Sequence, residues 1–308
     1  MLRGGARVRK LRSMQSREPF VTYLELRESA ADGSQGAGLS HTSKGLVLLH
    51  VLELAAYGEP RGAVTIVHDA GDHGGRYVPV ARALAEDGWA VALPDLRGHG
   101  RSEGERGHVN GVQEIVRDLS DVQDHLAYRQ PDAPKVLVGQ GLGALWCLAY
   151  ACEKPDGIAA LVLVSPLVSP RFETPKAPGV LSGLFKKVGP TSPGRTGWDP
   201  AQRTSDVAAQ AALRADELAH DVVTLRAGEQ AIEAARRYVP RIQEMPMPLL
   251  VLAGSADPIA GAECARALHG PRVDVETFEG LRHDLFHEAR SAEVVSRLRA
   301  WLDARLPR

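Results

Sequence analysis

The sequence is poor in features typical of secreted, membrane-spanning or nucleic-acid-binding proteins. Its three cysteines, Cys147, Cys152 and Cys264, are too few and too scattered for a disulfide framework or a zinc site. No apolar run approaches the roughly 18 residues of a membrane-spanning helix. The formal net charge of −1 provides no overall field that would attract nucleic acid. We therefore expect a cytoplasmic protein without disulfides, a metal or another cofactor.

Residues 1–44 are expected to form a loose basic tail before the folded domain. They mix charged residues, Gly, Ser and Gln around one short apolar patch at 20–26. No apolar segment of a secretory signal follows the basic residues. The six scattered positive charges up to Arg17 would give at most weak contact with anionic lipid. A true start at Met14 is an alternative interpretation.

From residue 45 onward, β-type and helix-type apolar patterns alternate. The expected strands are 46–54, 63–68, 89–93, 136–138, 158–164, 249–252 and 273–278, and the expected helices are 77–86, 112–126, 142–151, 259–269 and 291–305. Such alternation predicts an α/β domain over 45–308, with a mostly parallel central sheet and helices on both faces.

The alternation stops between about residues 166 and 240. This stretch begins with Pro-, Gly- and Ser-rich sequence, continues with helical patterns and shows no clear strand. We interpret it as a helical cap inserted after the sixth core strand, above the carboxyl ends of the strands. Leu181, Leu184 and Phe185 would line an acyl pocket there or simply pack the cap.

The turn at residues 139–143 lacks the one side chain that such a turn usually carries. An apolar strand leads into Gly-Gln-Gly-Leu-Gly, and an apolar helix follows. This is the strand–turn–helix pattern of a G-x-S-x-G nucleophile elbow, in which the central serine attacks the substrate. The central residue here is Gly141, so the pattern is that of a serine hydrolase without its nucleophile.

Three further segments fit the same chemistry. A Gly-rich turn at 68–77 follows a strand and could aim backbone N–H groups at an oxyanion. Asp257 and His283 each follow a late strand. The chain order of nucleophile position, acid and histidine is that of α/β-hydrolases.

The segments together resemble the monoacylglycerol lipase and lysophospholipase branch of the α/β-hydrolases. Residues 68–77 resemble its His-Gly-x-Gly-Glu-His-Ser-Gly-Arg-Tyr, and residues 95–104 its Asp-x-x-Gly-His-Gly-x-Ser-x-Gly. Residues 254–257 and 280–283 resemble its acid and histidine segments, and 216–220 its Asp-Pro-Leu-x-His. Each motif is weak alone, whereas five in order are specific. The similarity, to a serine aminopeptidase-type hydrolase domain, extends from about residue 45 to the C-terminus.

The resemblance implies roles for four residues around Gly141. Asp257 would orient and charge-balance His283, His283 would be the general base, and the N–H groups of Ala70 and Leu142 would form the oxyanion hole. The implied ligand is a small apolar molecule or an acyl ester. The sequence does not identify a protein partner.

The chain departs from the family pattern at two positions, Gly141 and Asp69. Asp69 stands where the family has glycine, and its carboxylate would repel a developing oxyanion if it pointed inward. A glycine at 141 should keep the strained turn intact, so the fold should survive the loss of serine.

Three functional hypotheses follow. In the first, the chain is a catalytically silent or strongly impaired homologue that keeps an apolar ligand pocket or binds a protein partner. Alternatively, a water activated by His283 and Asp257 hydrolyses a monoacylglycerol or lysophospholipid ester at a low rate. In the third hypothesis, Gly141 is an isolated change and the natural gene encodes serine.

Other polar residues are expected to serve structure. Ser102 and Ser255 do not lie on a strand-to-helix elbow and are poor candidates for a substitute nucleophile. His68 and His73 should satisfy local hydrogen bonds rather than bind a metal. Cys147 should lie in the core.

Overall fold

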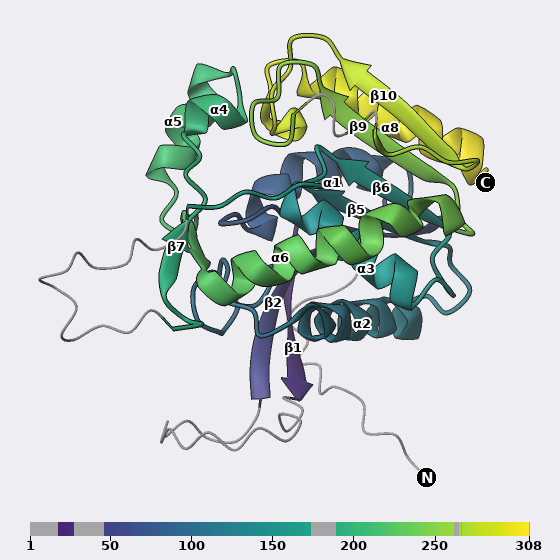
Figure 1. The fold of residues 1–308 in the computed structure, drawn as a ribbon. Coiled ribbons are helices and arrows are strands. Elements are labelled where there is room, and N and C mark those ends of the chain that lie inside the picture. The colour runs from purple at the N-terminus through teal and green to yellow at the C-terminus, as the bar shows by residue number, and fades with distance from the viewer. Residues whose placement is uncertain (1–17, 28–45, 174–188, 262–264, 266, 308) are drawn as a thin grey trace, which may run out of the picture.

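The fold is built around one eight-stranded sheet (Figure 1). The computed structural model describes residues 18–27, 46–173, 189–261, 265 and 267–307. The strands of the sheet are β1 (Phe20–Arg27), β2 (Leu46–Leu54), β3 (Gly62–Val67), β4 (Trp89–Pro94), β5 (Lys135–Gln140), β6 (Ala160–Val164), β9 (Leu249–Gly254) and β10 (Val273–Phe278). Their order is β1-β2-β4-β3-β5-β6-β9-β10. The β1–β2 and β2–β4 pairs are antiparallel, and all later pairs are parallel. The predicted mostly parallel sheet is confirmed.

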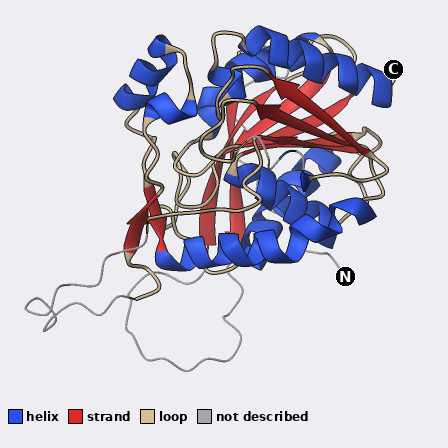
Figure 2. Cartoon of the chain, turned by 45° about the horizontal axis from the view of Figure 1, so that its top comes forward, coloured by secondary structure: helices blue, strands red, loops and turns tan. Residues whose placement is uncertain are grey.

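Helices cover both faces of the sheet (Figure 2). They are α1 (Val78–Glu86) and α8 (Ser291–Arg305) on one face, and α2 (Val112–Arg129), α3 (Leu142–Glu153) and α6 (Leu225–Tyr238) on the other. The strand side chains alternate between the two layers. In β5, Val136 and Val138 pack with α1 and α8, whereas Leu137 packs with α2 and α3. Both faces are therefore apolar, which explains the continuous hydrophobic run of β5.

The prediction that residues 1–44 form a loose tail is wrong for residues 20–27. These residues form β1, which pairs along its whole length with β2. Thr22, Leu24 and Leu26 are buried, so every second side chain faces the core. That period of two is the pattern of a half-buried strand. Residues 1–17 and 28–44, including the basic residues before Arg17, lie outside the described part.

The cap follows β6 as predicted, but it contains two strands that the sequence did not reveal. Its elements are β7 (Pro193–Arg195), α4 (Pro200–Arg203), α5 (Val207–Ala215), β8 (Val222–Thr224), α6 and the short helix η2 (Val239–Glu244). β7 and β8 pair as a separate antiparallel sheet. Each has three residues, too few to display a period of two. Leu181, Leu184 and Phe185 lie outside the described residues, as do several residues of the helix expected at 259–269.

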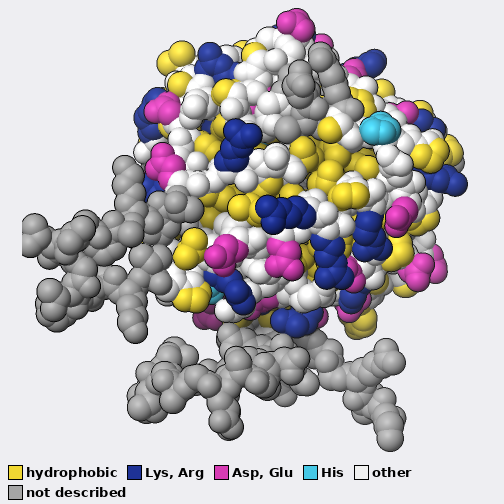
Figure 3. All heavy atoms as spheres, viewed as in Figure 1, with side chains coloured by type: hydrophobic (Ala, Val, Ile, Leu, Met, Phe, Trp, Pro, Cys, Tyr) yellow, Lys and Arg dark blue, Asp and Glu magenta, His cyan; other side chains and the backbone are white. Residues whose placement is uncertain are grey.

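The surface carries charges of both signs among hydrophobic patches on the face seen in Figure 3. This mixture agrees with the near-zero net charge. Of the helices in the described ranges, none is long and apolar enough to cross a bilayer.

Candidate active site

The turn at residues 139–143 has the sharp strand-to-helix geometry expected of a nucleophile elbow. β5 ends at Gln140, and α3 begins at Leu142. Gly141 between them has φ of 56° and ψ of −115°, a conformation that residues with a Cβ rarely adopt. At Gly143, a Cβ would overlap the backbone of Val67 and His68, so α3 can approach β3 closely only with glycine there. The elbow is therefore intact although its serine is absent.

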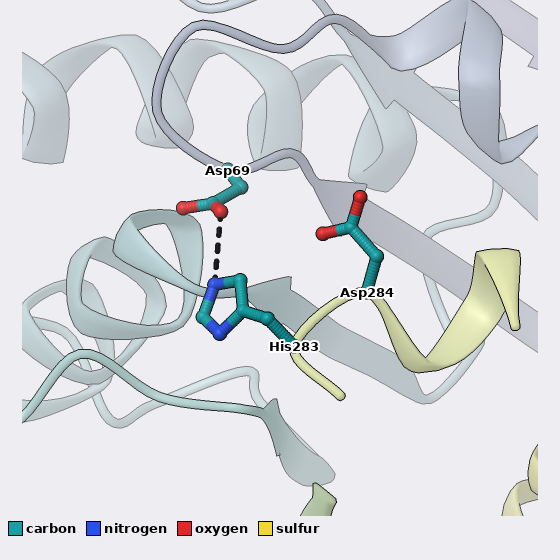
Figure 4. Close-up of side chains that lie close together, drawn as sticks. All are labelled: Asp69, His283 and Asp284. Atoms are coloured by element: carbon teal, nitrogen blue, oxygen red, sulfur yellow. Dashed lines mark hydrogen bonds and ion pairs between the residues drawn. The ribbon is translucent and has the colours of Figure 1, made fainter. Parts of the chain in front are cut away.

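The Asp69 carboxylate points into the site from the loop after β3 (Figure 4). Its Oδ1 accepts hydrogen bonds from the backbone N–H groups of Ala70 and Leu142, each at 2.7 Å. These are the two donors expected to form an oxyanion hole. They converge on one oxygen atom, and that atom belongs to the protein itself.

Asp69 also occupies the space that a side chain at position 141 would need. A Cβ built on Gly141 would overlap the carboxyl group of Asp69. Both residues are buried, so the Asp69 carboxyl group cannot make room by rotating into solvent. The two departures from the family pattern are thus sterically coupled: with Asp69 in this position, residue 141 must be glycine.

His283 lies between two carboxylates. Its Nδ1 is 2.9 Å from Asp257 Oδ2, and its Nε2 is 3.0 Å from Asp69 Oδ2. The other oxygen of Asp257 accepts hydrogen bonds from the backbone N–H groups of Ile259 and Ala260, which fix the carboxylate. The structure therefore brings together all five residues of the predicted site, and adds Asp69.

The two carboxylates set the charge of His283. Complete burial by itself would lower the pKa of the imidazole, but Asp257 and then Asp69 outweigh burial and raise the pKa to about 10. His283 is therefore an imidazolium at neutral pH. An imidazolium has no free lone pair and cannot accept a proton from a serine or a water.

A cap residue, Arg203 at the end of α4, joins this site. Its guanidinium lies 2.9 Å from Asp72, 3.0 Å from Asp284 and 3.9 Å from Asp69. Burial raises the pKa of the Asp72 carboxyl, but Arg76 and Arg203 outweigh it and lower the pKa overall. The cap is thus connected to the core by a buried ion network.

The same segment of the cap is hydrogen-bonded to the loop that carries His283. The backbone N–H of Asp284 donates to the carbonyl of Arg203 at 2.6 Å, and Thr204 Oγ1 donates to the carbonyl of His287 at 2.9 Å. Ser205 binds the Glu288 carboxylate. The ring of Trp198 packs at a tilt of 56° against His283, with ring centroids 5.7 Å apart. These contacts hold the cap closed over the site.

Sequence reasoning missed Arg203 and its closest carboxylate partners, Asp72 and Asp284. Within the described residues, Asp69, His283 and Asp284 also form a group whose potential ligand atoms lie within 4.8 Å of one another. Arg203 and Arg76 supply the positive charge beside these carboxylates, and His283 is protonated. We therefore assign no metal to this cluster. No sequence motif marks Arg203, because an isolated arginine at the end of a short helix is ordinary.

The other polar residues considered in the sequence analysis form hydrogen bonds within the fold, and Cys147 is buried in the core. Ser102 donates to the carbonyl of Asp95, and Ser255 accepts from the N–H of Gly280. His68 bonds backbone groups on two neighbouring loops, and His73 lies 2.8 Å from Asp216 of the cap. Burial raises the pKa of the Cys147 thiol, which keeps the residue protonated and unreactive in the core.

The cavity beside the site is small. It measures about 30 Å³ and is lined by apolar side chains that include Ala70, Leu96, Leu142 and Trp146. At roughly 10–15 Å³ per water, it holds about two water molecules. An acyl chain does not fit it in this closed arrangement.

The fold and the arrangement of elbow, acid and histidine define an α/β-hydrolase. Residues 58–290 match the family described as serine aminopeptidase, S33, and the chain belongs to that family. It is 29% identical over 263 residues to a monoacylglycerol lipase of Mycolicibacterium smegmatis, covering 80% of this chain and 90% of the relative. It is 30% identical over 258 residues to the monoglyceride lipase of Rattus norvegicus, covering 81% and 84%.

A solved structure is similar over nearly its whole length. The monoacylglycerol lipase of Paleococcus ferrophilus superposes with a TM-score of 0.72 at 27% identity, covering 83% of this chain and 99% of that one. These similarities agree with the family resemblance found in the motifs.

Proposed function

We propose that this chain is a silent or strongly impaired member of the monoacylglycerol lipase-like hydrolases, which keeps a binding site for an apolar ligand. The observation that carries the loss of ester hydrolysis is the position of the Asp69 carboxylate. It holds both oxyanion-hole donors and takes the space of the nucleophile. A substrate carbonyl oxygen cannot reach N–H groups that already bind a carboxylate.

The charge of His283 argues against hydrolysis by an activated water. That mechanism needs a neutral imidazole to take a proton from the water. With a pKa of about 10, His283 is almost entirely protonated at neutral pH. A water attacking an ester would therefore find neither a neutral imidazole nor a free oxyanion hole.

The overlap with Asp69 argues against the hypothesis that serine stands at position 141 in the natural gene. A serine there would meet the Asp69 carboxyl group. An isolated change of Ser to Gly would leave a family glycine at position 69, whereas both positions differ here. Two sterically matched differences support a coordinated loss of ester hydrolysis.

An activity-based probe tests the silent site directly. A fluorophosphonate reacts with activated serines, so we expect no labelling of the wild-type chain, while an active serine esterase in the same reaction is labelled. The labelled peptide, if any, is mapped by mass spectrometry. Labelling at one defined residue would contradict the proposal, as would ester turnover that His283→Ala abolishes.

A further inference from the structure

A second hollow of the protein lies outside the closed catalytic pocket. It is a groove of about 240 Å³ between α6, η2 and the segment after β6, compared with about 30 Å³ beside Asp69. Its lining residues are Val168, Ser169, Pro170, Ile232, Ala235, Arg236, Val239 and Pro240. The groove exceeds the roughly 150 Å³ of a protein cavity that accepts benzene, so it has room for a short alkyl chain.

The lining of the groove is mostly apolar. Val168, Pro170, Ile232 and Val239 contribute hydrophobic side chains, and Ile232 is 37% exposed although it is large and aliphatic. In the space-filling view, hydrophobic side chains gather on the face over α6, with Lys and Arg side chains around them (Figure 3). An exposed apolar surface of this kind favours an apolar ligand.

One cation in the lining distinguishes this groove from a purely hydrophobic surface. Arg236 is exposed and forms no ion pair with any residue of the described ranges. Its neighbour Arg237 is paired with Glu153 at 3.0 Å, and Arg241 lies 3.6 Å from Glu244. Arg236 is therefore the guanidinium available to a ligand in the groove, and Ser169 adds a hydroxyl group.

We propose that this groove binds a medium-chain fatty acid, with its carboxylate on Arg236 and its alkyl chain against Val168, Pro170 and Val239. A guanidinium pairs well with a carboxylate, and burial of methylene groups adds affinity along the chain. The proposal rests on the ligand-binding part of the proposed function and names its ligand class. It needs no opening of the cap over Asp69.

Isothermal titration with sodium decanoate, below its micelle concentration, tests the proposal. We expect saturable binding to the full-length chain, weakened at least about tenfold by Arg236→Gln, which removes the charged hydrogen bonds. Arg237→Gln is the matched control, because it removes one positive charge from the next position outside the groove, and binding should be unchanged. Decanol, which lacks the carboxylate, should bind about tenfold more weakly.

Chain length provides a second readout. From hexanoate to decanoate, affinity should rise about fourfold per added methylene while the groove fills, because each buried CH₂ contributes a nearly constant free energy. No saturable binding, equal binding by Arg236→Gln, or equal binding of decanol would overturn the proposal. These outcomes would not contradict the proposal that the hydrolase site is silent, because that proposal is tested separately by fluorophosphonate labelling and ester turnover.

Discussion

The double variant Asp69→Gly/Gly141→Ser is expected to hydrolyse p-nitrophenyl butyrate at least about 10³-fold faster than the wild-type chain. Loss of the nucleophile costs a serine hydrolase about 10⁶ in kcat, so partial recovery of the triad is a large effect. The variant restores the nucleophilic hydroxyl group. It also removes the Asp69 carboxylate that accepts hydrogen bonds from the N–H groups of Ala70 and Leu142. This carboxylate is also one of the two that raise the pKa of His283, so without it the imidazole can again act as a base.

The single variants are the matched controls. Gly141→Ser should stay inactive and lose stability, because its side chain overlaps the Asp69 carboxyl group. Asp69→Gly should also stay near the wild-type rate, since it opens the oxyanion hole without providing a nucleophile. Kinetics on all four proteins would contradict this account if Gly141→Ser alone were as active as the double variant.

The variant Arg203→Met is expected to lower the free energy of unfolding by about 3 kcal/mol or more. Removing one partner of a buried ion network leaves uncompensated buried charge, which typically costs 3–5 kcal/mol. Here Asp72 and Asp284 would both lose a cation at 3.0 Å or less. Urea unfolding followed by far-ultraviolet circular dichroism measures the change.

Arg214→Met provides the control for this prediction. Arg214 lies in the same cap, but its pair with Asp199 is exposed on both sides. Exposed pairs contribute about 0–1 kcal/mol, so this change should be small. If Arg203→Met were as mild as Arg214→Met, the ion network would not be what holds the cap closed.

The layered fold could be predicted because the patterns of its buried strands and of its amphipathic helices are both strong in the sequence. Continuous apolar runs such as 136–138 indicate strands buried on both faces, and the helical spacing over 112–126 matches most of α2. Strand β1 was missed because its apolar residues alternate with polar ones and polar sequence flanks it on both sides. β7 and β8 were missed because three residues cannot show a period.

The sequence predicted which residues form the site, but it did not predict the charge contacts among them. Turn chemistry and chain order pointed to Gly141, Asp257 and His283, which the fold brings together. The direction of the Asp69 side chain depends on two backbone donors, the neighbouring Ala70 and the distant Leu142 at the start of α3. Arg203 joins through the cap, and no local pattern records a contact between segments 131 residues apart.

Nuclear magnetic resonance of the His283 side chain tests the central claim most directly. With the ring nitrogens labelled, the imidazole of the wild-type chain should be doubly protonated at pH 7 and titrate near pH 10. In Asp69→Asn, which keeps the shape and removes the charge, the pKa should fall. A neutral His283 at pH 7 in the wild-type chain, or a titration that Asp69→Asn does not move, would contradict a carboxylate that fills the oxyanion hole and holds the histidine charged.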